Sequence, residues 1–119
     1  MEIGLIIRYG KLVPGREHQA IELFQEAMAY FTRKRETGEI TWFEPFFFQT
    51  SDLDEELGFY IAKGSAPQVF ALIEEEAYRT LMQKAMTLVE HVRMDFLTVG
   101  EGIPAQVALS IKVLAELGV

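Results

Sequence analysis

The chain contains no cysteine, and this absence excludes several kinds of site at once. Disulfide bonds, thiolate metal ligands and cysteine nucleophiles cannot form. Long hydrophobic runs are absent as well, because no stretch reaches the length of a membrane-spanning helix. The first residues lack both the basic segment and the long apolar segment of a secretory signal. We therefore expect a cytoplasmic protein.

Basic residues are scarce: 11 lysines and arginines stand against 18 aspartates and glutamates, which gives a net charge of −7. An acidic surface repels phosphate backbones and anionic lipids, so neither nucleic acid nor a membrane is expected as a partner. The one basic cluster, Arg33-Lys34-Arg35, falls at the end of a predicted helix. A favourable interaction with the helix dipole explains it there.

Hydrophobic residues are abundant, making up 50% of the 119 residues and spread along the whole length. This composition predicts one folded domain over residues 1–119 with a single core. Successive segments show the periodicity of strands and of helices. The expected strands cover 3–9, 39–49, 57–63 and 92–99; the expected helices cover 16–37, 65–88 in two pieces, and 103–118.

Three local signals refine these elements. Pro45 inside the second strand indicates an edge strand or a bulge, because proline has no backbone N–H to donate. Ser65, followed three residues later by Gln68, predicts a capping box at the start of a helix. The acidic run Glu74-Glu75-Glu76 interrupts the apolar stripe of that helix, so we expect a bend and a solvated break there.

The order of elements is β, α, β, β, α, β and then an additional helix. This order predicts an α+β protein of the ferredoxin-like class, with a four-stranded antiparallel sheet and two helices that cover one of its faces. The strands do not alternate cleanly between apolar and polar residues, as they would if the second face met water. We expect that face to pair with a second copy of the chain, and the alternative cover is the C-terminal helix folding back.

Several segments resemble the dimeric α/β-barrel superfamily, most closely its small uncharacterised bacterial members. They are Trp42-Phe43-Glu44-Pro45-Phe46, the strand-to-helix passage from Gly58-Phe59-Tyr60 to Lys63-Gly64-Ser65, and Val99-Gly100-Glu101-Gly102. The resemblance implies a homodimer built from βαββαβ units. It implies no single activity, because members of the superfamily differ widely in what they do.

Polar residues inside the predicted strands are the main candidates for a site. Burial makes charge costly unless it is paired or used. One interpretation is a pocket that orients an organic ligand, with aromatic walls; the other is a salt-bridge network between strands or subunits. By strand alternation we expect Arg8, Glu44, Tyr60, Arg93 and Asp95 to share one face of the sheet. The candidate ligand-binding residues are Arg8, Trp42, Glu44, Phe46, Tyr60, Arg93 and Asp95.

The two histidines and Tyr60 are the candidates for chemistry. His18 is a candidate general base, since imidazole titrates near neutral pH, and Tyr60 is a second catalytic candidate. The YCII-like branch of the superfamily implies an aspartate partner, for which Asp52 or Asp54 is available. A solvated histidine on a helix surface is the alternative for His18.

His91 follows the second helical region. Some haem-binding members of the superfamily use a histidine of the second helix, but a histidine at a helix end is also explained by the helix dipole. With two histidines and no cysteine, neither a metal site nor a cofactor is expected.

Three functions fit these observations. The first is a homodimeric domain that binds a small apolar or aromatic molecule between sheet and helices. The second is a cofactor-independent monooxygenase, or a small isomerase or lyase. The third is a structural or assembly protein, which the C-terminal helix favours because it is apolar on several sides.

Overall fold

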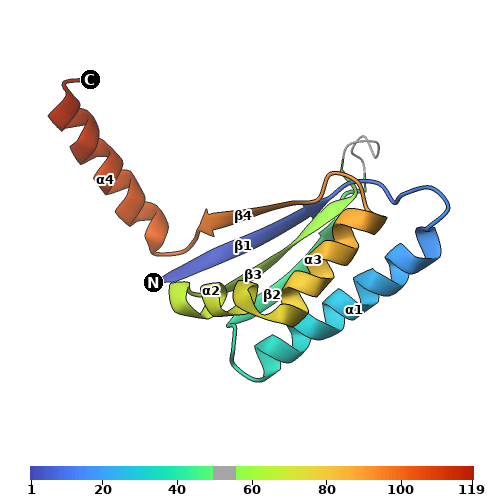
Figure 1. Cartoon of the computed structure of the whole chain (residues 1–119). Coiled ribbons are helices and arrows are strands. Elements are labelled where there is room, and N and C mark those ends of the chain that lie inside the picture. The colour runs from blue at the N-terminus through green and yellow to red at the C-terminus, as the bar shows by residue number, and fades with distance from the viewer. Residues whose placement is uncertain (50–55) are drawn as a thin grey trace.

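One antiparallel sheet with helices on one side forms the body of the protein in the computed structural model, which describes residues 1–49 and 56–119 (Figure 1). The described elements follow the order β, α, β, β, α, α, β, α. They are β1 (Glu2–Tyr9), α1 (Glu17–Glu36), β2 (Trp42–Phe47), β3 (Gly58–Ser65), α2 (Ala66–Glu74), α3 (Glu76–Leu88), β4 (Arg93–Thr98) and α4 (Gly102–Leu117).

The strands lie in the order β2-β3-β1-β4, and every neighbouring pair is antiparallel. β2 is therefore an edge strand, as Pro45 predicts. Pro45 pairs with Tyr60 of β3 and has no strand on its other side. The ferredoxin-like α+β fold predicted from the sequence is confirmed, with α4 as an addition to it.

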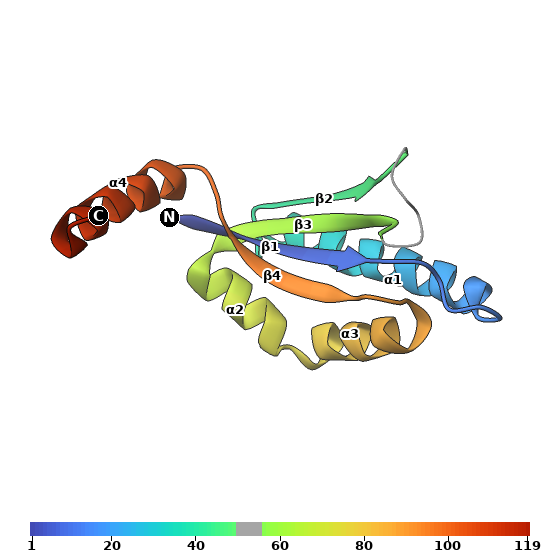
Figure 2. The ribbon, with the colours of Figure 1, turned by 90° about the horizontal axis from the view of Figure 1, so that it is seen from above.

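The helices α1, α2 and α3 all cover the same face of the sheet (Figures 1 and 2). Side chains at alternate strand positions point to this face and form the core with the helices. Leu5 and Ile7 of β1 are 1% and 2% exposed. From the other strands and α1 come Phe43, Tyr60 and Phe31, whose rings contact one another. Hydrophobic burial at this interface holds the helices on the sheet.

Gly58 permits a close approach at the start of β3. It pairs with Tyr9 of β1, whose side chain passes close above it. A Cβ built on Gly58 would overlap the carbonyl oxygen of Phe46 and lie 3.0 Å from the Tyr9 hydroxyl oxygen. Only glycine leaves room for the Phe46 backbone and the Tyr9 hydroxyl at this position.

The second helical region breaks into α2 and α3, as the acidic run predicts. The predicted capping box opens α2: the Ser65 hydroxyl accepts from the Gln68 backbone N–H, and the Gln68 side chain accepts from the Ser65 N–H. Glu75 ends α2 and begins α3 with an extended ψ of 139°. This single residue lets the two helices take different directions.

The C-terminal helix α4 does not fold back over the sheet, so the alternative cover predicted for the second face is wrong. α4 leaves the end of β4 and rises away from the sheet, on the side opposite to α1, α2 and α3 (Figure 1). No described helix is long and apolar enough to cross a membrane.

The sheet face opposite α1, α2 and α3 is named the free face. Its central side chains, such as Ile6 and Ile61, are half-buried and apolar, while charged side chains lie around them. By strand alternation and register, the free face consists of Ile6, Arg8, Trp42, Glu44, Phe46, Phe59, Ile61, Lys63, Arg93, Asp95 and Leu97.

Candidate functional site

An apolar cavity of about 270 Å³ lies between the sheet and the helices α1 and α3. The sheet forms its floor, α1 and α3 form its walls, and half-exposed Ile21 and largely exposed Phe47 mark its opening to the surface. Aromatic and aliphatic side chains of these elements line it, among them Phe24, Phe47, Tyr9, Tyr60, Leu81 and Ala85.

Tyr60 and Tyr9 are the two described lining residues that carry a polar side-chain group. Tyr60 is 9% exposed, and its ring packs against both Phe31 and Phe43 at centroid distances of 5.4 and 5.8 Å. No described residue hydrogen-bonds to its hydroxyl group. Burial raises the pKa of the Tyr60 phenol, and the nearby phenols of Tyr78 and Tyr9 raise it further. Tyr60 therefore stays protonated at neutral pH and can donate a hydrogen bond.

The hydroxyl groups of Tyr9 and Tyr78 are arranged differently. The Tyr9 hydroxyl is fully buried, and no described group bonds to it. Burial raises the pKa of Tyr9 to about 12. The Tyr78 hydroxyl donates to the sulfur of Met94 over 2.9 Å, and burial raises its pKa to about 12 as well. Tyr9 and Tyr60 thus both line the cavity with a hydroxyl to which no described group bonds, whereas Tyr78 does not line it.

The predicted set of strand residues separates into two groups in the structure. Six of the seven lie on the free face: Arg8, Trp42, Glu44, Phe46, Arg93 and Asp95. Tyr60 does not share that face, so the predicted alternation was wrong for this residue. Tyr60 pairs with Ile7 and points with it into the core, because Gly58, Tyr60, Ala62 and Gly64 form the buried side of β3.

Two polar contacts order the free face. The Arg8 guanidinium donates to Glu56 over 2.6 Å and 3.2 Å, and this hydrogen bond holds the pKa of Glu56 below its usual value. The Lys63 ammonium lies 4.2 Å from the centroid of the Trp42 ring. Phe46 stacks on Phe59 at 4.9 Å. None of the six residues lines the apolar cavity, and their predicted role in binding a ligand stays a prediction.

The histidines lie away from the cavity lining. The His18 side chain is 89% exposed, and its Nε2 atom is 3.1 Å from Glu22 one turn along α1. His91 is exposed in the turn before β4 with a φ of 57°, in the left-handed region. Asp52 and Asp54, the predicted partners of His18, lie outside the described residues. The arrangement of the described residues therefore favours the phenols over the histidines as the polar groups of the site.

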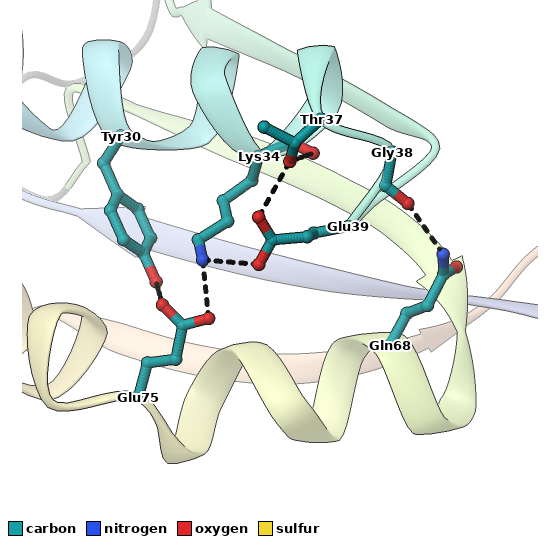
Figure 3. Close-up of polar contacts among 7 residues, drawn as sticks. All are labelled: Tyr30, Lys34, Thr37, Gly38, Glu39, Gln68 and Glu75. Atoms are coloured by element: carbon teal, nitrogen blue, oxygen red, sulfur yellow. Dashed lines mark hydrogen bonds and ion pairs between the residues drawn. The ribbon is translucent and has the colours of Figure 1, made fainter.

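A polar cluster behind the cavity fixes the direction of α3 (Figure 3). The Lys34 ammonium, at the end of α1, is 2.7 Å from Glu39 and 2.6 Å from Glu75. The Tyr30 hydroxyl donates to the other oxygen of Glu75 over 3.0 Å. Burial lowers the pKa of Lys34, but its hydrogen bonds to both carboxylates outweigh this and raise it overall. The break between α2 and α3, which was predicted to be solvated, is therefore held in place by contacts of Glu75 with α1.

Sequence reasoning missed most of the cavity. Phe24 and Ala85 look like ordinary core positions, because a cavity-lining side chain has the same helical spacing as a packed one. Phe47 carries a weak signal: it is a large aromatic residue near the end of an edge strand, yet it is largely exposed in the structure.

No protein-family model and no curated protein matches this chain. Solved structures do share its fold. A dimeric protein of unknown function with a ferredoxin-like fold from Bacteroides fragilis is 13% identical, with a TM-score of 0.59, over 80% of this chain and 93% of that one. An ethyl tert-butyl ether D (EthD) family protein from Bacillus halodurans is 14% identical, with a TM-score of 0.57, over 81% and 96%.

A variant of SnoaB, a cofactor-independent oxygenase from Streptomyces nogalater, is 14% identical, with a TM-score of 0.61, over 84% of this chain and 94% of that one. At these identities the likeness concerns the fold and not the activity. The chain thus has the ferredoxin-like fold that the sequence resemblance implied.

Proposed function

We propose that this chain binds a small, largely apolar organic molecule in the cavity between the sheet, α1 and α3. The observation that carries this proposal is an apolar lining in which the hydroxyl of Tyr60, like that of Tyr9, has no partner among the described groups. Binding sites commonly combine apolar walls with a few polar groups that orient the ligand. The ligand would carry one hydrogen-bond acceptor that faces Tyr60.

The size of the cavity limits the ligand. A cavity of about 150 Å³ in an engineered protein holds a benzene molecule. The cavity here, about 270 Å³, has room for a compound of one or two rings.

Tetralin and 1-tetralone test the role of Tyr60, because they share a two-ring skeleton and differ by one carbonyl oxygen. We expect 1-tetralone to bind more tightly by about five- to tenfold, since a net hydrogen bond contributes about 1 kcal/mol. Tyr60→Phe should remove this difference and leave tetralin binding in place. Isothermal titration calorimetry measures both affinities, which should not change between about pH 6 and about pH 9, since the Tyr60 phenol stays protonated there.

Two variants serve as controls. Tyr78→Phe removes a hydroxyl that is bonded to Met94, so it should keep the preference for 1-tetralone. Ala85→Leu adds atoms to the cavity lining and should weaken both compounds. Failure of both compounds to bind, or a Tyr60→Phe variant that keeps the preference, would contradict the proposal.

We further propose that the protein is a homodimer joined through the free face. Half-buried apolar side chains at the centre of that face remain uncovered in the single chain, and one structure of the same fold is described as dimeric. Cross-subunit ion pairs would then use charged residues such as Glu44 and Arg93. The cytoplasmic location stays a prediction.

A cofactor-independent oxygenase is the second candidate. Its support is the fold shared with SnoaB together with a phenol that faces a ligand-sized cavity. The raised pKa of Tyr60 makes this phenol a hydrogen-bond donor rather than a proton acceptor, so a substrate would have to ionise by itself. Oxygen uptake in the presence of a dihydroxynaphthalene, and its loss in Tyr60→Phe, would support this candidate over simple binding.

A further inference from the structure

The first turn of α4 is held in a fixed direction against the end of β4. The Thr98 hydroxyl donates to the side-chain oxygen of Gln106 over 2.6 Å. The backbone N–H of Gly102 donates to the Val99 carbonyl over 3.0 Å. A Cβ at Gly102 would lie 3.1 Å from Thr98 and 3.2 Å from the sulfur of Met1. The elbow between β4 and α4 is therefore tightly packed, and α4 is not a loose tail.

Beyond this elbow, α4 presents large apolar side chains to solvent. Its only charged residues are Lys112 and Glu116, which lie one turn apart on the same side of the helix. The exposed apolar residues of α4 and the chain end are Ile103, Val107, Leu109, Ile111, Val113, Leu114, Leu117 and Val119, each between 41% and 83% exposed. Contiguous apolar surface of this extent marks an interaction site.

The spacing of these residues favours a folded protein surface as the partner. Ile103, Val107 and Leu114 follow one another at intervals of four and seven, which aligns them in one stripe along the helix. Lys112 lies on the opposite side from this stripe. A helix that lies on a lipid surface carries a basic polar face, which α4 lacks.

The direction of α4 indicates which surface it meets. α4 rises on the same side of the sheet as the free face, whereas α1, α2 and α3 lie on the other side (Figure 1). Viewed from above the sheet, α4 extends beyond the end of β4 and the N-terminus (Figure 2). A second copy seated on the free face would therefore lie beside α4.

We infer that α4 is an arm that packs against the second copy of this chain. This inference rests on the proposed homodimer: the free faces join the two copies, and each α4 adds apolar contact at one end of the interface. In a twofold dimer the contact occurs twice, so each substitution in α4 acts at two places. The arm would raise the affinity of the dimer without touching the cavity.

Charge substitution on the stripe tests the arm. Val107→Glu with Leu114→Glu places two carboxylates on the exposed stripe, where both side chains are about half exposed and the fold of the chain does not depend on them. We expect this double variant to raise the dissociation constant of the dimer at least about tenfold, measured by sedimentation velocity over a concentration series.

The matched control is Ala108→Glu with Ala115→Glu. It adds the same charge to the same helix at the same spacing of seven, but about 100° further around the helix axis. We expect its dimer dissociation constant to stay within about twofold of that of the unsubstituted chain. Binding of 1-tetralone should be unchanged in both double variants, because no residue of α4 lines the cavity.

The outcomes separate the arm from the proposals on which it rests. A dimer that is equally strong in both double variants would overturn the arm and leave the homodimer standing. A monomeric unsubstituted chain would overturn both, whatever the result for 1-tetralone. A monomer that sediments with phosphatidylcholine vesicles, and loses this property in Val107→Glu/Leu114→Glu, would make α4 a lipid anchor and also overturn the arm.

Discussion

Buried tyrosines in this protein have hydroxyl groups in contrasting surroundings. Tyr9 and Tyr30 are 9% and 7% exposed, so their rings are buried to the same degree. The Tyr30 hydroxyl donates to the carboxylate of Glu75, whereas no described group bonds to the hydroxyl of Tyr9. A buried polar group without a partner loses its hydration and gains nothing in return. The two side chains can therefore be compared directly, because they are equally buried and differ in whether the hydroxyl is hydrogen-bonded.

Replacement by phenylalanine should act in opposite directions at these two positions. Tyr9→Phe is expected to leave the free energy of unfolding unchanged or to raise it by up to about 1 kcal/mol, because it removes an unpaired hydroxyl. Tyr30→Phe is expected to lower it by about 1–2 kcal/mol, because a hydrogen bond to a charged group is lost. Urea titration measures both values. Equal losses at the two positions would show that the Tyr9 hydroxyl is bonded in solution.

The face of a strand on which a residue lies is hard to predict from sequence. For Arg8, Glu44 and Asp95 the predicted shared face is the observed one. Tyr60 lies on the other face, although it is only one position from Phe59 and Ile61 on the free face. A shift of one residue places a side chain on the opposite face of the sheet, and β3 carries apolar residues on both faces. Only the register against β1 decides which side is buried.

At the scale of elements, the break between α2 and α3 matters most for the cavity. α3 contributes Leu81 and Ala85 to the lining, and its direction is set at Glu75. Lys34 and Tyr30 of α1 hold the carboxylate of Glu75 at 2.6 and 3.0 Å. The cluster therefore connects the two helices that form the cavity walls.

Removal of the Glu75 carboxylate should destabilise the fold, whereas removal of the neighbouring Glu74 carboxylate should not. Glu75→Ala is expected to lower the free energy of unfolding by about 1–2 kcal/mol, since charge-assisted hydrogen bonds from two partners are lost and the carboxylate is partly exposed. Glu74→Ala is the matched control, because Glu74 is exposed and should change stability by less than about 0.5 kcal/mol.

A double-mutant cycle with Lys34→Met measures how much of this loss belongs to the ion pair. The coupling free energy should fall with added salt, because partly exposed charges are screened. A cycle without measurable coupling would show that Glu75 acts through its hydrogen bond from Tyr30 and through the helix ends, and not through the ion pair.

The helices and strands were predicted better than the face of the sheet on which each strand residue lies. The edge position of β2, the capping box at Ser65 and the break at Glu75 follow from local chemistry, namely a missing N–H, a hydroxyl acceptor and a run of charge. The direction of α4 could not be predicted in this way. Its sequence shows apolar residues on several sides, but the direction of the helix is set by the elbow at Gly100 and Gly102. Glycine adopts many backbone angles, and the spacing of apolar residues does not predict which of them it takes.

At the scale of the whole molecule, the free face and α4 are apolar surfaces that the described part of a single chain leaves uncovered. Burying half-exposed side chains such as Ile61 contributes roughly 1 kcal/mol or more each. The cavity lies on the other side of the sheet from the free face, between the sheet and its helices, so all of its lining comes from one chain. Self-association and ligand binding should therefore be separable.

The homodimer can be followed through Trp42, the only tryptophan of the chain and a member of the free face. At protein concentrations of about 100 µM we expect a mass of twice 13.6 kDa by light scattering. Ile61→Asp, at the centre of the free face, should give a monomer, and Trp42 emission should move to longer wavelength because the indole meets water. Thr80→Asp adds the same charge on the exposed surface of α3 and should leave the dimer intact. An Ile61→Asp variant with dimeric mass would place the interface elsewhere, whereas a monomer that still binds 1-tetralone would show that the cavity works without the partner.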